Sequence, residues 1–218
     1  TDDLDLYHAK TETMLRHFAG QYGVPLADDI PEWDMSFNPH DSVRVDFDAK
    51  TINTFQLTKY MKNMKVAKKP PTCPPTIMKV MHHALGSDPD ITAHFVNWVA
   101  FILQNRAMTR TSWVWHGNQG TGKGLLMNQI LRPIFGQQQT VVKRLEEFNE
   151  QYNAYMLNCF IVFVDEFQIK ALDNERGAMS KIKNFITEPR VPVRAMYQGA
   201  FEAENYTNWI FASNESDS

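Results

Sequence analysis

A glycine-rich loop between an apolar strand and a helix constrains this sequence more than any other feature. The segment Gly117-Asn118-Gln119-Gly120-Thr121-Gly122-Lys123 follows the strand-like run Thr111–His116 and precedes a helical pattern over Gly122–Leu131. Glycines allow a tight backbone path on which N–H groups point inward, and the start of the helix adds its positive end. We therefore expect Gly117 to Leu125 to bind the phosphates of a nucleotide, with Lys123 reaching the β- and γ-phosphates.

The loop departs from the usual pattern at its last position. Gly124 stands where Ser or Thr normally gives a hydroxyl to Mg²⁺. A bound Mg²⁺ must then depend on other ligands or on water, or the site is weakened.

A second chemical motif is an apolar strand that ends in two acids. Phe160-Ile161-Val162-Phe163-Val164 leads directly into Asp165 and Glu166. A buried parallel strand delivers such residues to the carboxyl edge of its sheet, where ligands of α/β proteins bind. Asp165 suits coordination of Mg²⁺, and Glu166 suits general-base catalysis on an attacking water. The alternative is a strand that simply ends in solvated acids.

A third motif follows the same design near the end of the sequence. The apolar run Trp209–Ala212 ends in Ser213-Asn214. The amide of Asn214 can hydrogen-bond both a γ-phosphate and the attacking water. An isolated Asn after a strand is more often a turn residue, but its order after the other two motifs favours the functional interpretation.

The arrangement of the apolar segments predicts the fold class. From residue 111 onward strands alternate with helices, and fully apolar strands are typical of a sheet buried on both faces. We expect an α/β core with a parallel sheet over residues 111–218, preceded by a small, mostly helical leader over residues 1–110. Within the leader we expect helices over 4–18, 76–85 and 90–105, a short strand over 43–47, and an exposed basic, proline-rich loop over 59–75. This loop is either a solvated linker or a DNA-binding arm.

Bulk composition excludes several classes of protein. The formal net charge of −3 argues against a polycation that holds duplex DNA, so any nucleic-acid contact must be local. No apolar run reaches the length that spans a bilayer, so we expect no membrane partner. Cys73 and Cys159 lie outside any Cys or His cluster, which indicates neither disulfides nor zinc. The first residue is Thr1, so we expect the chain to be cut from something longer, in the cytoplasm of a cell or phage host.

Together the three motifs resemble those of the superfamily 3 helicases of viruses, phages and plasmids, most closely the helicase part of primase-helicases. This resemblance implies an AAA+-like P-loop NTPase core with ATP and Mg²⁺ as cofactors. It assigns Lys123 as the loop lysine, Asp165 as the metal ligand, Glu166 as the catalytic base and Asn214 as the sensor. Ile52-Asn53-Thr54-Phe55 and Asn97-Trp98 are similar to the segment that precedes the helicase core.

A hairpin between the second and third motifs is the expected DNA contact. Val191–Tyr197 and Phe201–Glu204 flank Gln198-Gly199-Ala200. In the family such a hairpin lines a central pore and grips single-stranded DNA. Lys183, Arg194 and Tyr197 would then supply phosphate contact and base stacking. The alternative is that Tyr197 is packed and the lysines form a solvated helix face.

We therefore expect an ATP-hydrolysing DNA helicase or translocase domain of a mobile-element replication protein, active as a hexameric ring. The sequence ends four residues after Asn214, before the region where the family places its arginine finger. The resemblance leaves open a primase domain in the same polypeptide. Two alternatives remain: a DNA-packaging ATPase, and a catalytically weak nucleotide-binding scaffold for replication-complex assembly. A small-molecule kinase would have no use for Ser213-Asn214 or the hairpin.

Overall fold

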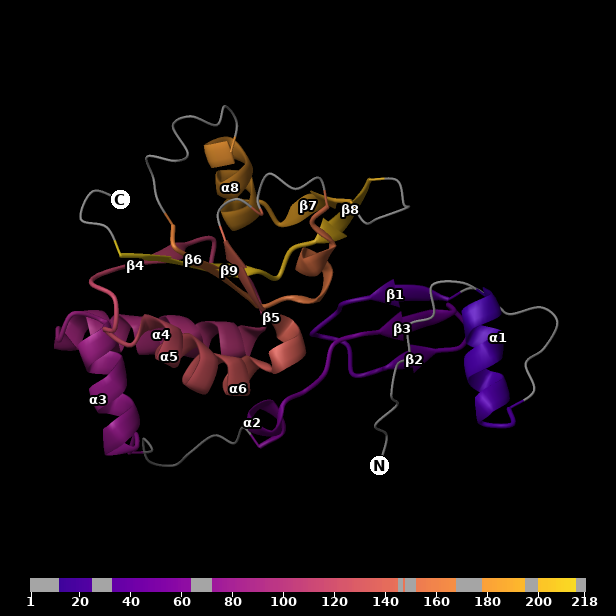
Figure 1. Cartoon of the computed structure of the whole chain (residues 1–218), viewed down its shortest axis with the longest axis horizontal. Helices are drawn as coiled ribbons and strands as arrows, with labels where there is room; N and C mark the ends of the chain where they lie inside the picture. Colours follow the sequence, from indigo (N-terminus) through magenta and orange to yellow (C-terminus); the bar gives the residue numbers. More distant parts are fainter. Residues whose placement is uncertain are drawn as a thin grey trace.

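A four-stranded, all-parallel sheet forms the centre of the protein (Figure 1). The computed structural model describes residues 12–24, 33–63, 72–144, 147, 152–167, 178–194 and 200–214 of the 218-residue chain. Across the sheet the strands are β4 (Ser112–His116), β9 (Asn208–Ser213), β6 (Ile161–Asp165) and β5 (Thr140–Arg144). The expected parallel α/β sheet is confirmed.

Both faces of the central strands β6 and β9 are buried, as their apolar sequences predict, whereas the edge strands β4 and β5 are partly exposed. Alternate residues of a strand point to opposite faces, and β6 shows this directly: Ile161 and Phe163 belong to one hydrophobic cluster, Val162 and Val164 to the other. Ile161, Val162 and Val164 are fully buried, and Phe163 is 2% exposed. The sheet is therefore the middle layer of a three-layer arrangement.

Helices form the layer below the sheet in Figure 1. Asp88 caps α4 (Pro89–Asn105) through its side chain, and Pro89 occupies the first turn, where its missing N–H is harmless. After the glycine-rich loop the helix continues past the expected end at Leu131, through a π-helical segment that precedes Pro133. The wider π turn accommodates a proline that a regular turn does not. The layer contains α3 (Pro75–Ala84), α4 (Pro89–Asn105), α5 (Lys123–Leu125), η1 (Leu126–Leu131) and α6 (Arg132–Phe135), followed by η2 (Gln137–Gln139).

In the described residues, the layer above the sheet contains the helix α8 (Ala178–Thr187), the short helix η4 (Ala154–Asn158) and the expected hairpin. Phe185 of the helix stacks on Trp209 of β9 with an interplanar angle of 7°. The hairpin strands pair antiparallel, with Val193 opposite Phe201, so this prediction is confirmed, while residues 195–199 at its tip lie outside the described part. The elements are η4 (Ala154–Asn158), α8 (Ala178–Thr187), β7 (Arg190–Val193) and β8 (Phe201–Glu204).

The leader was expected to be mostly helical, but it also contains a three-stranded sheet. β3 pairs parallel with β1 and antiparallel with β2. β1 and β3 have three residues each, too short for a pattern of alternating hydrophobicity to stand out. The elements are α1 (Glu12–Gln21), β1 (Asp34–Ser36), β2 (Val45–Asp46), β3 (Thr51–Asn53) and α2 (Lys59–Lys62). The expected strand over 43–47 corresponds to β2, and residues 4–11 of the first expected helix and 64–71 of the basic loop are outside the described ranges.

One glutamine joins the leader to the central sheet. The side chain of Gln139 accepts from the backbone N–H of Gln56 (3.1 Å) and donates to the carbonyls of Gln56 (3.0 Å) and Phe135 (2.7 Å). Nearby, Phe37 and Phe55 pack edge-on against Phe160, with centroids 5.4 and 5.8 Å away. The small sheet thus contacts the amino-terminal edge of the central sheet. Among the described residues no helix combines the length and the hydropathy that crossing a bilayer would require.

Candidate nucleotide-binding site

The glycine-rich loop leaves the carboxyl end of β4 and is fixed by the neighbouring strand. The N–H of Gly117 donates to the carbonyl of Ser213 over 3.2 Å. Gly120 and Gly122 have φ values of 87° and 94°, a left-handed region that residues with a Cβ rarely adopt. The hydroxyl of Thr121 donates to the carbonyl of Asn118 over 3.0 Å. The loop therefore has a defined shape that depends on glycine at two positions.

The side chain of Lys123 lies within this loop and hydrogen-bonds to three of its residues. Its residue is 8% exposed, and its ammonium donates to the carbonyls of Gly117 (2.6 Å) and Asn118 (3.1 Å) and to the hydroxyl of Thr121 (3.4 Å). Burial lowers the pKa of Lys123, and the nearby Asp165 carboxylate raises it in part. The Asp165 carboxylate therefore favours the charged form of Lys123, a residue that the sequence predicts to act together with it.

The acidic pair occupies the end of β6. Asp165 is half-buried, and its Oδ1 accepts the backbone N–H of Glu166 over 3.0 Å. Glu166 has a φ of 55°, which is uncommon for a residue with a side chain and turns the chain away from the strand. Phe167 then donates its N–H to the carbonyl of Ala212 over 2.8 Å, returning the chain to β9. The carboxylate of Glu166 is left exposed to solvent at this edge.

Asn214 lies between the loop and the acidic pair because of the strand order. β9 separates β4 from β6, and Ser213 is in register with His116, the last residue before the loop. Asn214 is exposed and follows Ser213 directly. Three segments that are distant in sequence therefore meet at one sheet edge, the position where ligands of α/β proteins bind.

Gly124 occupies an ordinary helical position in α5. A Cβ added there would meet nothing within 4 Å. The side chain of Asn128 donates to the carbonyl of Gly124 over 2.9 Å and accepts from Arg132 over 3.1 Å. Across the described ranges no three His, Cys, Asp or Glu side chains form a metal-binding group. The ammonium of Lys123 and the glycine backbone fit nucleotide phosphates, whereas Mg²⁺ would rest on Asp165 and water.

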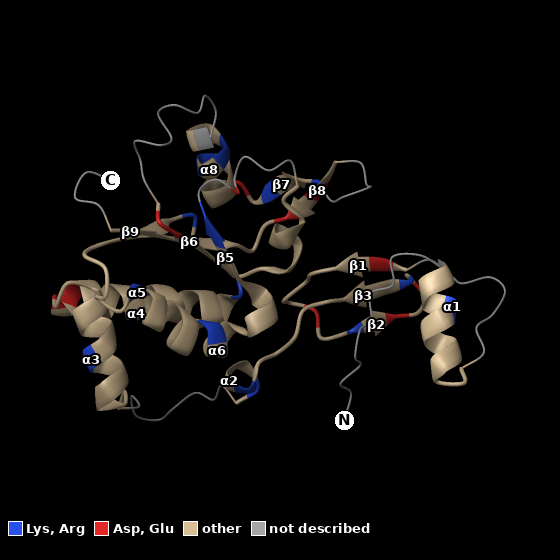
Figure 2. Ribbon diagram, viewed as in Figure 1, with Lys and Arg blue, Asp and Glu red and all other residues tan. Residues whose placement is uncertain are grey.

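The expected DNA-binding residues are only partly brought together. Arg194 lines a cavity of about 410 Å³ with Lys181 and Asn184, whereas Lys183 is exposed on α8 outside the lining of that cavity. Figure 2 shows basic positions on both α8 and β7. Tyr197 lies outside the described residues.

Sequence reasoning missed Asn153, which holds the base of the hairpin. It is 7% exposed; its Oδ1 accepts the N–H of Arg194 (2.8 Å), and its Nδ2 donates to the carbonyl of Pro192 (2.9 Å). The sequence offers no local sign of this role, because the contact spans about 40 residues.

The fold and the site place this chain in the class of α/β proteins that have a parallel sheet and a glycine-rich loop at the carboxyl edge of that sheet. Residues 115–218 match a family of unknown function, DUF5906. The chain is 30% identical over 170 residues to the DNA primase-polymerase of Nitratiruptor phage NrS-1, covering 77% of this chain and 23% of that protein. Two apo structures of the NrS-1 C-terminal region are similar, with TM-scores of 0.77 and 0.72, each at 26% identity over 93% of this chain.

The chain spans 48% of the length of those two solved structures and less than a quarter of the phage protein. The sequence identity and the structural similarity show that this chain is homologous to the C-terminal region of a phage DNA replication protein. The expected link to phage replication is confirmed to this extent. The name of the relative denotes an enzyme that synthesises DNA and mentions neither a helicase nor an ATP hydrolase.

Proposed function

We propose that this chain is the ATP-hydrolysing core of a ring-forming DNA helicase or translocase in a phage-type replication protein. The observation that carries the proposal is the position of β9 between β4 and β6, with the Ser213 carbonyl bonded to the Gly117 N–H. This arrangement sets Asn214 between the loop and the acidic pair, where one amide can contact both a terminal phosphate and an attacking water. A site that only binds nucleotide needs no such convergence.

Each residue has a defined task in this proposal. When ATP binds, the ammonium of Lys123 leaves the loop carbonyls and contacts the β- and γ-phosphates. The bond that is cleaved is the phosphoanhydride bond between these two phosphates. Asp165 takes part in holding Mg²⁺ together with water, because Gly124 supplies no hydroxyl. Glu166 accepts the proton of the attacking water, and Asn214 orients that water.

The DNA contact is assigned to the hairpin and the adjacent helix. Arg194 and Lys181 line the same cavity, and Lys183 and Tyr197 are further candidates for contact with a single strand. In a ring, a neighbouring subunit would add an arginine to the nucleotide site, and hydrolysis would move the hairpin along the DNA.

The test uses purified protein that carries Lys123→Ala or Glu166→Gln. Lys123→Ala should lose both nucleotide binding and ATP turnover, whereas Glu166→Gln should keep binding and lose turnover. Turnover at the wild-type rate in either variant would refute the proposal. Hydrolysis without strand separation on a forked DNA substrate would instead indicate a packaging-type translocase.

Gly124 favours a second candidate function, a nucleotide-binding scaffold in replication-complex assembly. Without the loop hydroxyl, Mg²⁺ has fewer protein ligands, and turnover depends on that ion. Measuring nucleotide affinity with and without Mg²⁺ separates the two functions. Tight binding that does not depend on Mg²⁺, with no turnover, would identify the scaffold.

A further inference from the structure

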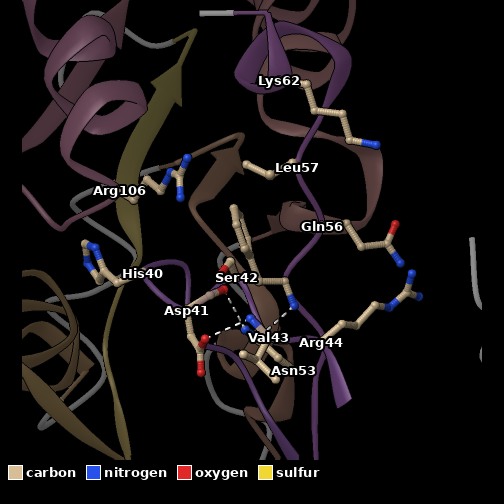
Figure 3. Close-up of a pocket in the computed structure, with 11 residues that line it drawn as sticks. His40, Asp41, Ser42, Val43, Arg44, Asn53, Gln56, Leu57, Lys62 and Arg106 are labelled. Atoms are coloured by element: carbon tan, nitrogen blue, oxygen red, sulfur yellow. Dashed lines mark hydrogen bonds between the residues drawn. The ribbon is translucent and has the colours of Figure 1, made fainter. Parts of the chain in front are cut away.

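A polar cavity of about 240 Å³ lies where the leader meets the central sheet (Figure 3). Arg106 contributes from the end of α4, just before β4 begins, and Phe55 contributes from the segment after β3. Phe55 packs against Phe160, which precedes β6. The cavity is therefore at the amino-terminal edge of the sheet, and Lys123 and Glu166 are at the opposite, carboxyl edge.

The lining of this cavity is positive, although the whole chain is negative. It includes three cationic side chains, Arg44, Lys62 and Arg106, against one carboxylate, Asp41, which gives a net formal charge of +2. The formal charge of the chain is −3. In Figure 3, Lys62 and Arg44 extend along one side together with the amide of Gln56, and Arg106 lies across from them. Within the described residues, neither Lys62 nor Arg106 forms an ion pair with a carboxylate.

Hydrogen bonds hold the cavity walls in place before any ligand binds. Asn53 is 6% exposed, and its Oδ1 accepts the N–H groups of Asn38 (3.0 Å) and Phe55 (3.1 Å). Its Nδ2 donates to the carbonyls of Asn38 (2.8 Å) and Asp41 (3.2 Å). The three bonds to Asn38 and Asp41 fasten the loop that carries Asp41 to β3.

The guanidinium of Arg106 is fixed in the same way. It donates to the carbonyl of Pro39 over 2.8 Å and lies 5.4 Å from the centroid of the Phe55 ring. A charge that is already positioned loses little side-chain entropy when it binds an anion. Arg106 thus presents a preformed positive charge to the cavity, and Lys62 adds an exposed one.

Size and charge together indicate the ligand. Pockets that enclose a small organic ligand usually measure roughly 300–1,000 Å³, so this cavity is too small to enclose a whole nucleotide and large enough for a phosphate with part of its sugar. We propose that the cavity defined by Arg44, Lys62 and Arg106 binds the phosphodiester backbone of single-stranded DNA. It is a second contact, separate from the hairpin, and it does not require ATP hydrolysis.

Two lysines of α2 provide a matched test. Lys62 lines the cavity, whereas Lys59 is outside its lining and has its ammonium 5.0 Å from the Tyr60 ring. Both are exposed in the same short helix, so Lys62→Gln and Lys59→Gln remove the same charge from the same element. Binding of the 218-residue chain to fluorescent oligothymidylate would be measured by anisotropy without nucleotide, over a range of salt concentrations.

We expect Lys62→Gln to weaken oligothymidylate binding about fivefold at 0.1 M salt and to reduce the salt slope by about 0.7, the value for one phosphate contact on a single strand. Lys59→Gln should leave both quantities unchanged, and equal melting temperatures would show that both variants are folded. Equal losses in the two variants, or no loss in either, would overturn the proposal.

Two competitors of oligothymidylate binding, inorganic phosphate and polyglutamate, test whether the cavity prefers DNA to other anions. Inorganic phosphate at about 10 mM should displace little oligothymidylate, because a single anion lacks the neighbouring contacts of a strand. Polyglutamate that binds as tightly as DNA and depends equally on Lys62 would overturn the proposal in favour of an acidic protein partner. Lys123→Ala should leave this binding intact, so a failure here is distinct from a failure of the ATPase proposal.

Discussion

Asn208 is the residue whose removal should most disturb the order of the central strands. Its side chain is 1% exposed at the start of β9. Its Oδ1 accepts the backbone N–H of Thr109 (2.7 Å) and the hydroxyl of the same residue (3.0 Å). Its Nδ2 donates to the carbonyls of Ala107 (3.3 Å), Tyr206 (3.2 Å) and Phe160 (3.3 Å). One amide therefore ties β9 to the segments that precede β4 and β6.

The expected cost of Asn208→Ala follows from what each partner loses. The Phe160 carbonyl keeps the backbone N–H of residue 208 (2.7 Å), and the Thr109 hydroxyl can turn to the Thr111 carbonyl (3.3 Å). The Thr109 N–H loses its partner, which costs about 1–3 kcal/mol. With the space left by the amide, we expect a total destabilisation of about 2–4 kcal/mol.

The assay is thermal unfolding followed by tryptophan fluorescence, with Asn97→Ala as the control. For a chain of this size, each kcal/mol lowers the melting temperature by about 2–4 °C, so Asn208→Ala should lower it by about 4–16 °C. Asn97 is exposed on α4, and its replacement should change the melting temperature by less than about 2 °C. A shift below about 3 °C for Asn208→Ala would show that the amide does not hold the strands together.

Three further predictions follow from the loop and the two thiols. Gly124→Ser should leave folding stability unchanged and leave or raise Mg²⁺-dependent ATP turnover, and a sharp loss of turnover would contradict this. Gly122→Ala, at a φ of 94°, should lower the melting temperature. Because burial lowers the pKa of Lys123, the unfolded chain binds more protons between that pKa and 10.5, so stability should rise with pH in this window. Melting curves should show that rise relative to Lys123→Met, and a parallel pH dependence in the two proteins would refute it. Burial raises the pKa of Cys159 to about 12, so a thiol reagent should modify exposed Cys73 rapidly and Cys159 only on unfolding; two fast thiols in the native protein would contradict this.

Much of the α/β core could be predicted because its signals are local. Each of β4, β6 and β9 coincides with an apolar run, and α3 and α4 match the expected helices within one residue. β5 was missed: it ends in Lys143-Arg144 at the edge of the sheet, where charged residues are common and the apolar signal is weak. In the leader, β1 and β3 were missed because they have only three residues each.

The individual residues of the candidate site were also predictable from local signals in the sequence. Their arrangement relative to one another was not. Glycine at 120 and 122 reflects a backbone conformation that few other residues accept, and this requirement is visible in the sequence. Asp165, Glu166 and Asn214 are recognisable because each follows a buried strand. That Lys181 lines the same cavity as Arg194 was not predictable, since Lys183 has the same chemistry two positions away.

The sequence alone determined which segments become strands of a buried sheet and which residues stand at their carboxyl ends, because hydrophobicity and backbone freedom act over a few residues. Only the tertiary structure decided that β9 lies between β4 and β6, and therefore that Asn214 separates the glycine-rich loop from the acidic pair. It alone also brought Arg44, Lys62 and Arg106 to one cavity. Such contacts depend on how distant segments pack, and no short stretch of sequence encodes that packing.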